Sequence, residues 1–226
     1  MSGLDLSPRN IQFLRERFAN KGHEGELVVG DMTDFRLAQP VDAAICMQDS
    51  QGHLLKTEQL VAHLRAVARC LKRGGLYVFD RYMVSSWTNP ARRWTWSKRR
   101  GRLIVRASFS ALNDVDPVSQ VFRERMTLEA VENGTRRLYR QTHLSRMVFP
   151  QELKTVVELA GGFEFVQWFF GFKPHQVLER SRHPIIMVVV LRKSKSPWRS
   201  GRPHSKSAGA CSSVPRPPAI ATSSWP

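Results

Sequence analysis

The sequence predicts an α/β protein with a doubly wound, mostly parallel β-sheet and an inserted antiparallel β-flap. Short apolar segments typical of buried strands alternate with helical segments as far as residue 82, which predicts the sheet. Alternating apolar and polar residues around an Asn-Gly pair predict the flap. An aspartate stands at or just after the end of each expected strand, where ligands bind in sheets of this kind: Asp5, Asp31, Asp49 and Asp80.

The first elements follow from capping residues and apolar spacing. Ser7 is a helix N-cap and Pro8 suits the first helical position, so a helix is expected over residues 8–21. The glycines at 22 and 25 end it, and residues 26–30 form a short apolar strand. These residues predict one strand–helix–strand unit.

The next unit repeats this order. Residues 42–47 form an apolar strand, and a helix over residues 57–71 begins with Thr57 as its expected cap. Gly74-Gly75 ends the region and precedes a strand over residues 76–79. The alternation therefore continues through a second helix.

After residue 82 the pattern becomes antiparallel. Strands are expected over residues 102–112, 119–131 and 136–148, and Asn133-Gly134 is a strong hairpin turn. A helix over 150–159 and an antiparallel pair of strands at the sheet edge follow. The expected domains are a partial core, a flap, the rest of the core and a disordered basic tail: 1–82, 83–149, 150–192 and 193–226.

Composition excludes some classes of protein. The net charge of +16 arises partly in the stretch from Lys193 onward, which has six basic residues and no acid. The long apolar run at 184–191 is too short to cross a bilayer, for which about 20 residues are needed. Three cysteines without pairing or metal-ligand spacing predict reduced thiols, a cytoplasmic location and no metal.

Four motifs resemble those of the class I S-adenosylmethionine-dependent methyltransferases, which have a Rossmann-like sheet. In order they are Gly3-Leu4-Asp5-Leu6-Ser7, Gly30-Asp31-Met32-Thr33-Asp34-Phe35, residues 42–47, and Leu71 to Asp80. A Gly-His-Leu run and the flap make the chain similar to small-molecule members, including amino-sugar N-methyltransferases. The resemblance implies S-adenosyl-L-methionine as cofactor and methyl transfer to nitrogen or oxygen of a small metabolite.

The resemblance also implies cofactor contacts. Asp5, with Leu6 beside it, would accept hydrogen bonds from the ribose hydroxyls. Asp31 would bind the adenine amino group while Met32 packs on the ring. The methionine end and its sulfonium would lie against Met47, Gln48 and Asp49.

One expected part has no room in this sequence. The glycine-rich cofactor loop stands about 20 residues before the ribose carboxylate, and counting back from Asp5 passes Met1. The first strand, which in this family lies between the strands at 3–6 and 42–47, is missing too. The sequence therefore predicts a truncated domain that begins at its second strand, with weak or no cofactor affinity.

His53, Asp49 and Tyr82 are the candidates for a general base or substrate contact, because each lies near a strand end. Alternative roles are a backbone hydrogen bond for His53 and helix capping for Asp49. His63, His143, His175 and His183 have no metal-ligand spacing and are expected to be structural.

Two further functions stay open. Trp87, Trp94 and Trp96 lie among arginines, a combination that can stack bases, so an RNA or protein methyltransferase is an alternative. The same residues also fit a hairpin that packs its tryptophans on the core and leaves its arginines in water. A non-catalytic fragment or interaction module is the third possibility.

Overall fold

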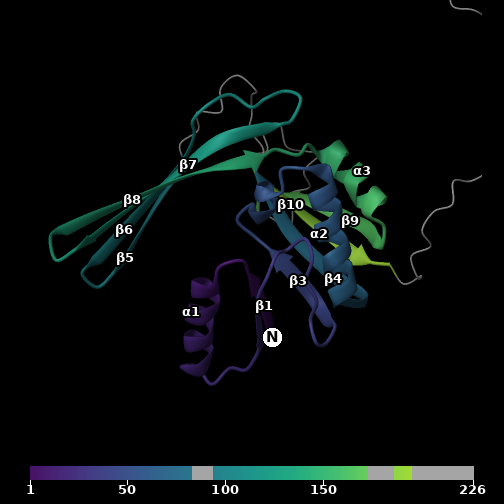
Figure 1. Ribbon diagram of the computed structural model, residues 1–226, viewed down its shortest axis with the longest axis horizontal. Helices are drawn as coiled ribbons and strands as arrows, with labels where there is room; N and C mark the ends of the chain where they lie inside the picture. The colour runs from purple at the N-terminus through teal and green to yellow at the C-terminus, as the bar shows by residue number, and fades with distance from the viewer. Residues whose placement is uncertain (83–93, 173–185, 195–226) are drawn as a thin grey trace, which may run out of the picture.

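The computed structural model describes residues 1–82, 94–172 and 186–194, and within these ranges the strands form three sheets (Figure 1). The helices are α1 (Pro8–Ala19), α2 (Thr57–Cys70), α3 (Pro150–Ala160) and the one-turn 3-10 helix η1 (Ser50–His53). The strands are β1 (Ser2–Asp5), β2 (Glu26–Val29), β3 (Val41–Cys46), β4 (Leu71–Tyr82), β5 (Trp94–Arg100), β6 (Leu103–Ala111), β7 (Val121–Glu132), β8 (Thr135–Arg146), β9 (Phe163–Phe170) and β10 (Ile186–Lys193).

The body of the protein is a four-stranded sheet in the order β3-β4-β10-β9. β3 runs parallel to β4, whereas β10 is antiparallel to both β4 and β9, as the sequence predicts for the last two strands. One face of this sheet packs against α2 and α3. The core between them includes Leu64, Phe79, Leu153 and Val189, all at most 1% exposed. The α/β class is therefore confirmed.

β1 and β2 form a separate parallel sheet, with Asp5 opposite Val29. Among the described residues, no strand pairs with the second edge of β1 or of β3, so the two sheets are not hydrogen-bonded to each other. Ile45, on this edge strand β3, is 74% exposed. The parallel strands therefore fall into two sheets rather than one continuous sheet.

Helix starts follow the sequence with one correction. Ser7 caps α1 by accepting a hydrogen bond from the backbone N–H of Asn10 (3.4 Å), as expected. Thr57 is wrong as the cap of α2, because Lys56 holds the N-cap position and Thr57 is the first helical residue. The Thr57 hydroxyl instead accepts a hydrogen bond from Arg146 (3.1 Å), which links α2 to β8.

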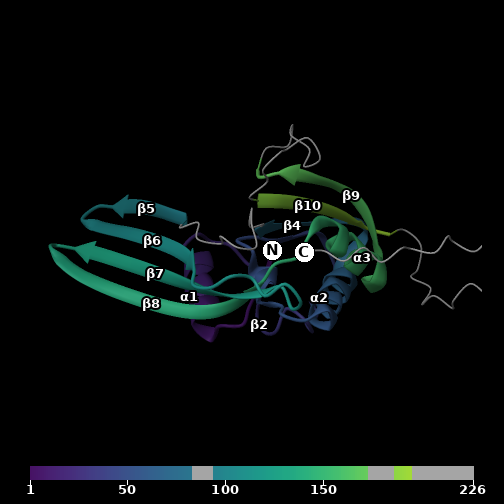
Figure 2. The same ribbon diagram turned by 90° about the horizontal axis from the view of Figure 1, so that it is seen from above.

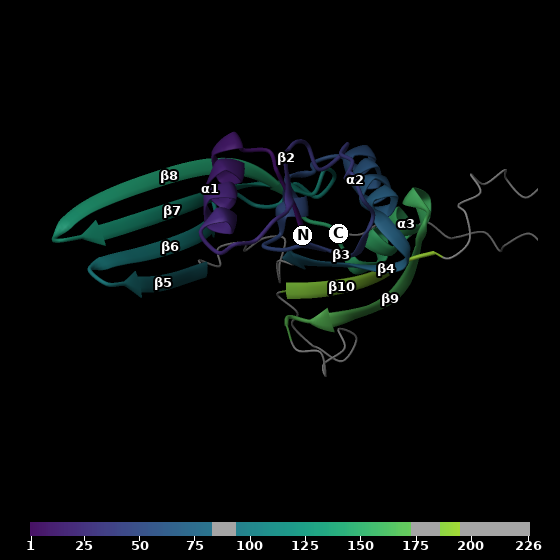
Figure 3. The ribbon, with the colours of Figure 1, turned by 90° about the horizontal axis from the view of Figure 1, so that it is seen from below.

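β5, β6, β7 and β8 form a long antiparallel arm that extends from the body (Figures 2 and 3). The turn between β7 and β8 is Asn133-Gly134, with φ of 49° and 79°, which confirms the predicted hairpin. β5 is not predicted by the sequence, because its Trp-Thr-Trp-Ser-Lys-Arg-Arg run has no regular alternation over its last residues.

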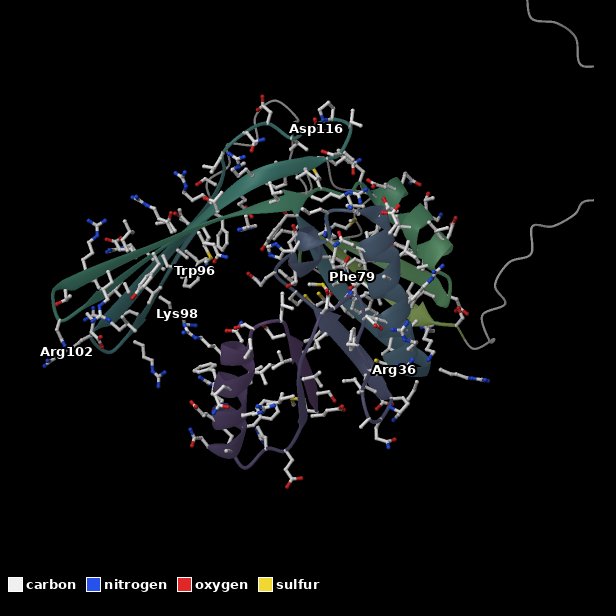
Figure 4. The ribbon with its side chains drawn as sticks, viewed as in Figure 1. Arg36, Phe79, Trp96, Lys98, Arg102 and Asp116 are labelled. Atoms are coloured by element: carbon white, nitrogen blue, oxygen red, sulfur yellow. The ribbon has the colours of Figure 1, made fainter. Side chains whose placement is uncertain are left out.

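The outer part of the arm is strongly basic. Lys98 and Arg102 lie towards the free end of the arm, far from Phe79 in the body (Figure 4). The exposed basic residues of the arm are Lys98, Arg99, Arg100, Arg102, Arg106, Arg123, Arg125, Arg136, Arg137 and Arg140. Trp96, on β5, is 45% exposed.

Some expectations fall on residues outside the described ranges. These are Trp87 and most of the tail predicted from residue 193. None of the described helices is long and apolar enough to span a lipid bilayer.

A buried hydrogen-bonded chain crosses the core beneath the 30–35 segment. Gln51 donates to the Tyr77 hydroxyl (2.8 Å), and that hydroxyl lies 2.6 Å from Nε2 of His63. The other ring nitrogen of His63 lies 2.9 Å from the Met32 carbonyl. These contacts fit a neutral His63 that accepts from Tyr77 and donates to Met32. Burial lowers the pKa of His63, opposed by the bond to Met32.

This chain predicts a pH dependence of folding. The folded pKa of His63 lies below the unfolded value of about 6.5, so the native state binds fewer protons than the unfolded state just below that pH. His63 therefore costs stability as the pH falls through this value. The free energy lost in His63→Gln should be largest above pH 6.5 and should shrink on acidification.

Urea unfolding of both proteins between pH 5 and 8 measures this difference, and other titrating groups cancel in it. The slope cannot exceed about 1.4 kcal/mol per pH unit for one proton. A difference that stays constant over this range would contradict a neutral, buried His63.

Candidate active site

The three catalytic candidates from the sequence converge where β3 and β4 end. The chain leaves β3 at Cys46 and turns through Gln48 and Asp49 into η1, which ends at His53. Gln48 and Asp49 have φ of 63° and 51°, a conformation that costs non-glycine residues about 1 kcal/mol or more. Two such residues in succession turn the chain sharply at the strand end. Tyr82, at the end of β4, interacts electrostatically with Asp49.

A fully buried arginine organises this region. Arg81, near the end of β4, is 0% exposed and its Nε lies 3.2 Å from Oδ1 of Asp49. The two side chains form an ion pair, but their relative orientation does not allow a hydrogen bond between these two atoms. Arg81 also donates to the Arg146 carbonyl on β8, while Asp80 accepts a hydrogen bond from the backbone N–H of Asp49 (3.0 Å). Arg81 therefore connects the strand end, the Asp49 turn and the arm.

Asp49 is the carboxyl group whose pKa is most changed here. Burial raises its pKa to about 7, while the Arg81 charge and the backbone N–H of Tyr82 oppose the rise. The neighbouring carboxylates of Asp80 and Glu124 raise the pKa further. The Asp49 side chain makes no capping bond to η1, so the alternative capping role is not observed. A carboxyl group that is partly protonated near neutrality can donate or accept a proton.

His53 is held by the arm. Its ring makes a hydrogen bond to the backbone of Leu144 that raises its pKa, so the acceptor is the Leu144 carbonyl and a ring N–H donates. The other ring nitrogen is then an acceptor when the ring is neutral. Burial and the neighbouring His143 lower the pKa of His53, and Glu124 raises it. His53 thus makes the backbone bond of its alternative role and keeps one nitrogen for chemistry.

Glu124 and His143 are functional candidates that the sequence analysis missed. They are cross-strand partners on β7 and β8, with His143 Nε2 3.0 Å from Glu124 Oε2. The rings of His143 and His53 meet edge to face, with centroids 4.9 Å apart. Glu124 also contributes to the raised pKa of Tyr82, after burial, Asp80 and Asp49. The pairing register that follows from the Asn133-Gly134 turn places Glu124 opposite His143, so the sequence contained a signal for this pair.

The predicted adenosine contacts lie at the ends of adjacent parallel strands. Asp5 accepts hydrogen bonds from the Ser7 backbone N–H (2.8 Å) and Asn10 Nδ2 (3.1 Å). Asp31 accepts from the backbone N–H (2.7 Å) and hydroxyl (2.9 Å) of Thr33, and these bonds lower its pKa. Both carboxylates keep further lone pairs, so neither role is blocked.

The other predicted cofactor residues differ in exposure. Leu6 is 75% exposed, and Gln48 is exposed at the turn after β3. Met32 packs against the hydrophobic core, and Met47 is half-buried. Asp5, Leu6, Asp31 and Met32 follow the small sheet, whereas Met47 and Gln48 follow β3 of the large sheet.

A surface groove elsewhere has a different character. It lies along α2, next to Thr33 and Leu159, and contains Arg65 and Arg69. Arg65 donates to carbonyls at the end of α3 and Arg69 pairs with Asp34, so both guanidinium groups are already engaged. The titratable cluster at the strand ends is the stronger candidate because its groups alter one another's pKa. No group of three or more potential metal-ligating side chains occurs within the described ranges.

The fold of the chain is similar to that of solved methyltransferases. A solved S-adenosylmethionine-dependent methyltransferase from Clostridium acetobutylicum aligns with 85% of this chain and 74% of its own, with a TM-score of 0.67 at 13% identity. An amino pentose methyltransferase from Micromonospora echinaspora, solved with S-adenosylmethionine bound, aligns with 85% of this chain and 73% of its own, with a TM-score of 0.63 at 19% identity. The chain therefore has the fold of the class I S-adenosylmethionine-dependent methyltransferases.

The amino-acid sequence is also similar to a family model and to a curated protein. Residues 1–75 match the family model described as a methyltransferase domain. The dTDP-3-amino-3,4,6-trideoxy-alpha-D-glucopyranose N,N-dimethyltransferase of Streptomyces venezuelae is 34% identical over 115 residues, which are 48% of this chain and 45% of that protein. The chain thus spans about half the length of this curated relative. The resemblance drawn from the sequence motifs is confirmed.

The close approach of η1 to β8 predicts that Gly52 cannot be enlarged without disturbing the site. A Cβ atom at Gly52 would stand 2.8 Å from Ser145 Oγ and 2.9 Å from Asp49 Oδ2. Gly52→Ala should therefore displace η1 and shift the NMR resonances of the His53 ring. Ser145→Ala, which removes one of the two contacts, should partly restore them in the double variant. Unchanged His53 resonances in Gly52→Ala would show that η1 does not depend on this approach.

Proposed function

We propose that the cluster at the ends of β3 and β4 serves S-adenosylmethionine-dependent transfer of a methyl group to the amino nitrogen of a small acceptor. The observation that carries the proposal is the convergence of Asp49, His53 and Tyr82 at the strand ends of a methyltransferase fold. The named relative from Streptomyces venezuelae, an N,N-dimethyltransferase of a dTDP-3-amino sugar, supports nitrogen as the acceptor atom. Carboxyl groups at the site favour a positively charged amine over a neutral alcohol.

The residues present fit the adenosine half of the cofactor. Asp5 and Asp31 offer two carboxylates at neighbouring strand ends, with lone pairs left for ribose hydroxyls and the adenine amino group. Met47 and Gln48 would hold the methionine half. When bound, S-adenosylmethionine supplies a methyl group on a positively charged sulfur, placed for in-line attack by an amine nitrogen.

These two sets of contacts follow separate sheets, which weakens the expected affinity. Binding both halves of one molecule would require the small sheet and the large sheet to be fixed relative to each other. Immobilising parts on binding costs free energy that subtracts from affinity. We therefore expect weak cofactor binding, so an assay of methyl transfer requires cofactor at millimolar concentration.

The protein's own groups prepare the acceptor. An amine arrives mainly as ammonium near neutral pH and must lose a proton before its nitrogen can attack. His53 has a ring nitrogen for that proton, since the Leu144 carbonyl engages the other. Asp49 and Tyr82 orient the amine by hydrogen bonds.

We place the protein in the cytoplasm, a proposal supported by the free thiols of Cys46 and Cys70.

The direct test is methyl transfer to a dTDP-linked 3-amino sugar, followed by mass spectrometry of the sugar. His53→Gln should lower kcat roughly 100-fold, the lower end of what general-base catalysis contributes. His23→Gln is the matched control, because His23 is an exposed loop residue outside the cluster. Absence of methylated sugar from the unaltered protein would contradict the proposal, and equal rates for both variants would remove His53 from it.

A further inference from the structure

The arm carries a pair of side chains that the function proposed above does not yet use. Glu124 lies on β7 and His143 opposite it on β8, and both are about a quarter exposed. Their 3.0 Å contact fixes the His143 ring against a carboxylate, with Nε2–H donating when the ring is neutral. The pair lies on the part of the arm that η1 contacts, because His143 packs against His53 at the end of η1.

The pair reaches His53 by two routes. The His143 ring packs on the His53 ring at 4.9 Å between centroids. The residue after His143 supplies the carbonyl that accepts the His53 N–H. The His53 ring thus contacts β8 through both His143 and Leu144, while Glu124 on β7 raises its pKa.

We propose that Glu124 and His143 are a positioning pair for His53: His143 fixes its ring, and Glu124 stabilises the imidazolium that forms when His53 takes the acceptor's proton. This role rests on the proposed function. An N–H bond of the acceptor's ammonium breaks, and its electron pair stays on the amine nitrogen for attack on the methyl group. A new N–H bond forms on His53, and the proton later leaves to water on the ring's exposed side.

The surrounding charges make Glu124 the group that fits this role. Arg81 opposes a positive His53, but its charge is paired with Asp49. Asp49 titrates near neutrality, and Tyr82 has a raised pKa and stays uncharged. Within the described ranges the ion-pair partner of Glu124 is His143 rather than a Lys or Arg, so the carboxylate is held beside the ring that packs on His53, where it raises the pKa of His53.

The test is a side-chain NMR titration of His53, which requires neither cofactor nor turnover. Glu124→Gln removes a negative charge and should lower the pKa of His53 on the order of half a pH unit. His143→Phe keeps an aromatic ring against His53 but removes a titratable one, so it should raise the pKa. Glu132→Gln, an exposed change on the same strand, is the control and should leave it unchanged.

The pH–rate profile separates catalysis from mere packing. If His53 acts as base, the acid limb of kcat/KM should move to lower pH in Glu124→Gln and to higher pH in His143→Phe, by the amounts that NMR gives. If the pKa of His53 is unchanged in both Glu124→Gln and His143→Phe, the positioning role is overturned. Shifts seen by NMR without matching shifts in the rate profile would also overturn it. Absence of methyl transfer by the unaltered protein would instead defeat the proposed function, and this role with it, whatever the titration shows.

Discussion

The buried charge of Arg81 is the constraint on which the candidate site depends. A guanidinium group with no exposure to water is very costly unless it is paired, and removing one partner of such a pair typically costs about 3–5 kcal/mol. Among the described residues, its partners are the Asp49 carboxylate and the Arg146 carbonyl. Asp49 must therefore stay at the strand end, even though this requires a left-handed backbone there.

The same charge explains the protonation state of the cluster. Asp49 is buried beside Arg81, and the nearby carboxylate of Asp80, which accepts the backbone N–H of Asp49, raises the pKa of Asp49. Burial favours the neutral carboxyl, and Asp49 accordingly titrates near pH 7. A group that can hold or release a proton at neutral pH thus follows from packing rather than from any one contact.

The arm belongs to the site through its base rather than its free end. Arg146 joins β8 to α2 and α3 through Thr57 and Glu152, and Gly52 allows η1 to approach Ser145 closely. The basic free end is remote from this region (Figure 4). The arm therefore presents one end to the body and the other to solvent, and these ends have different chemistry.

Much of the fold could be predicted from the sequence because local signals decide it. Ser7-Pro8 and Asn133-Gly134 each specify a helix start or a turn within a few residues, and the strand-end positions of Asp5, Asp31 and Asp49 follow from alternation. β5 was missed because its basic run lacks alternation, and its pairing depends on β6.

The candidate site was harder to predict because its contacts join distant segments. Asp49, His53 and Tyr82 could be selected by their places near strand ends. Glu124 lies eight residues before Glu132, and His143 eight after Thr135, so the hairpin register alone puts them opposite each other. Their approach to His53 could not be deduced, because it depends on how the arm docks on η1.

The central claim is that one small molecule bridges the ends of β1, β2 and β3. NMR titration of the backbone amides with S-adenosylhomocysteine tests it directly and tolerates weak binding. We predict concentration-dependent shifts at residues 5–6, 31–32 and 47–49 together, with smaller changes at the free end of the arm. Shifts confined to the α2 groove or to the basic end of the arm, with all three strand ends unmoved, would contradict the account.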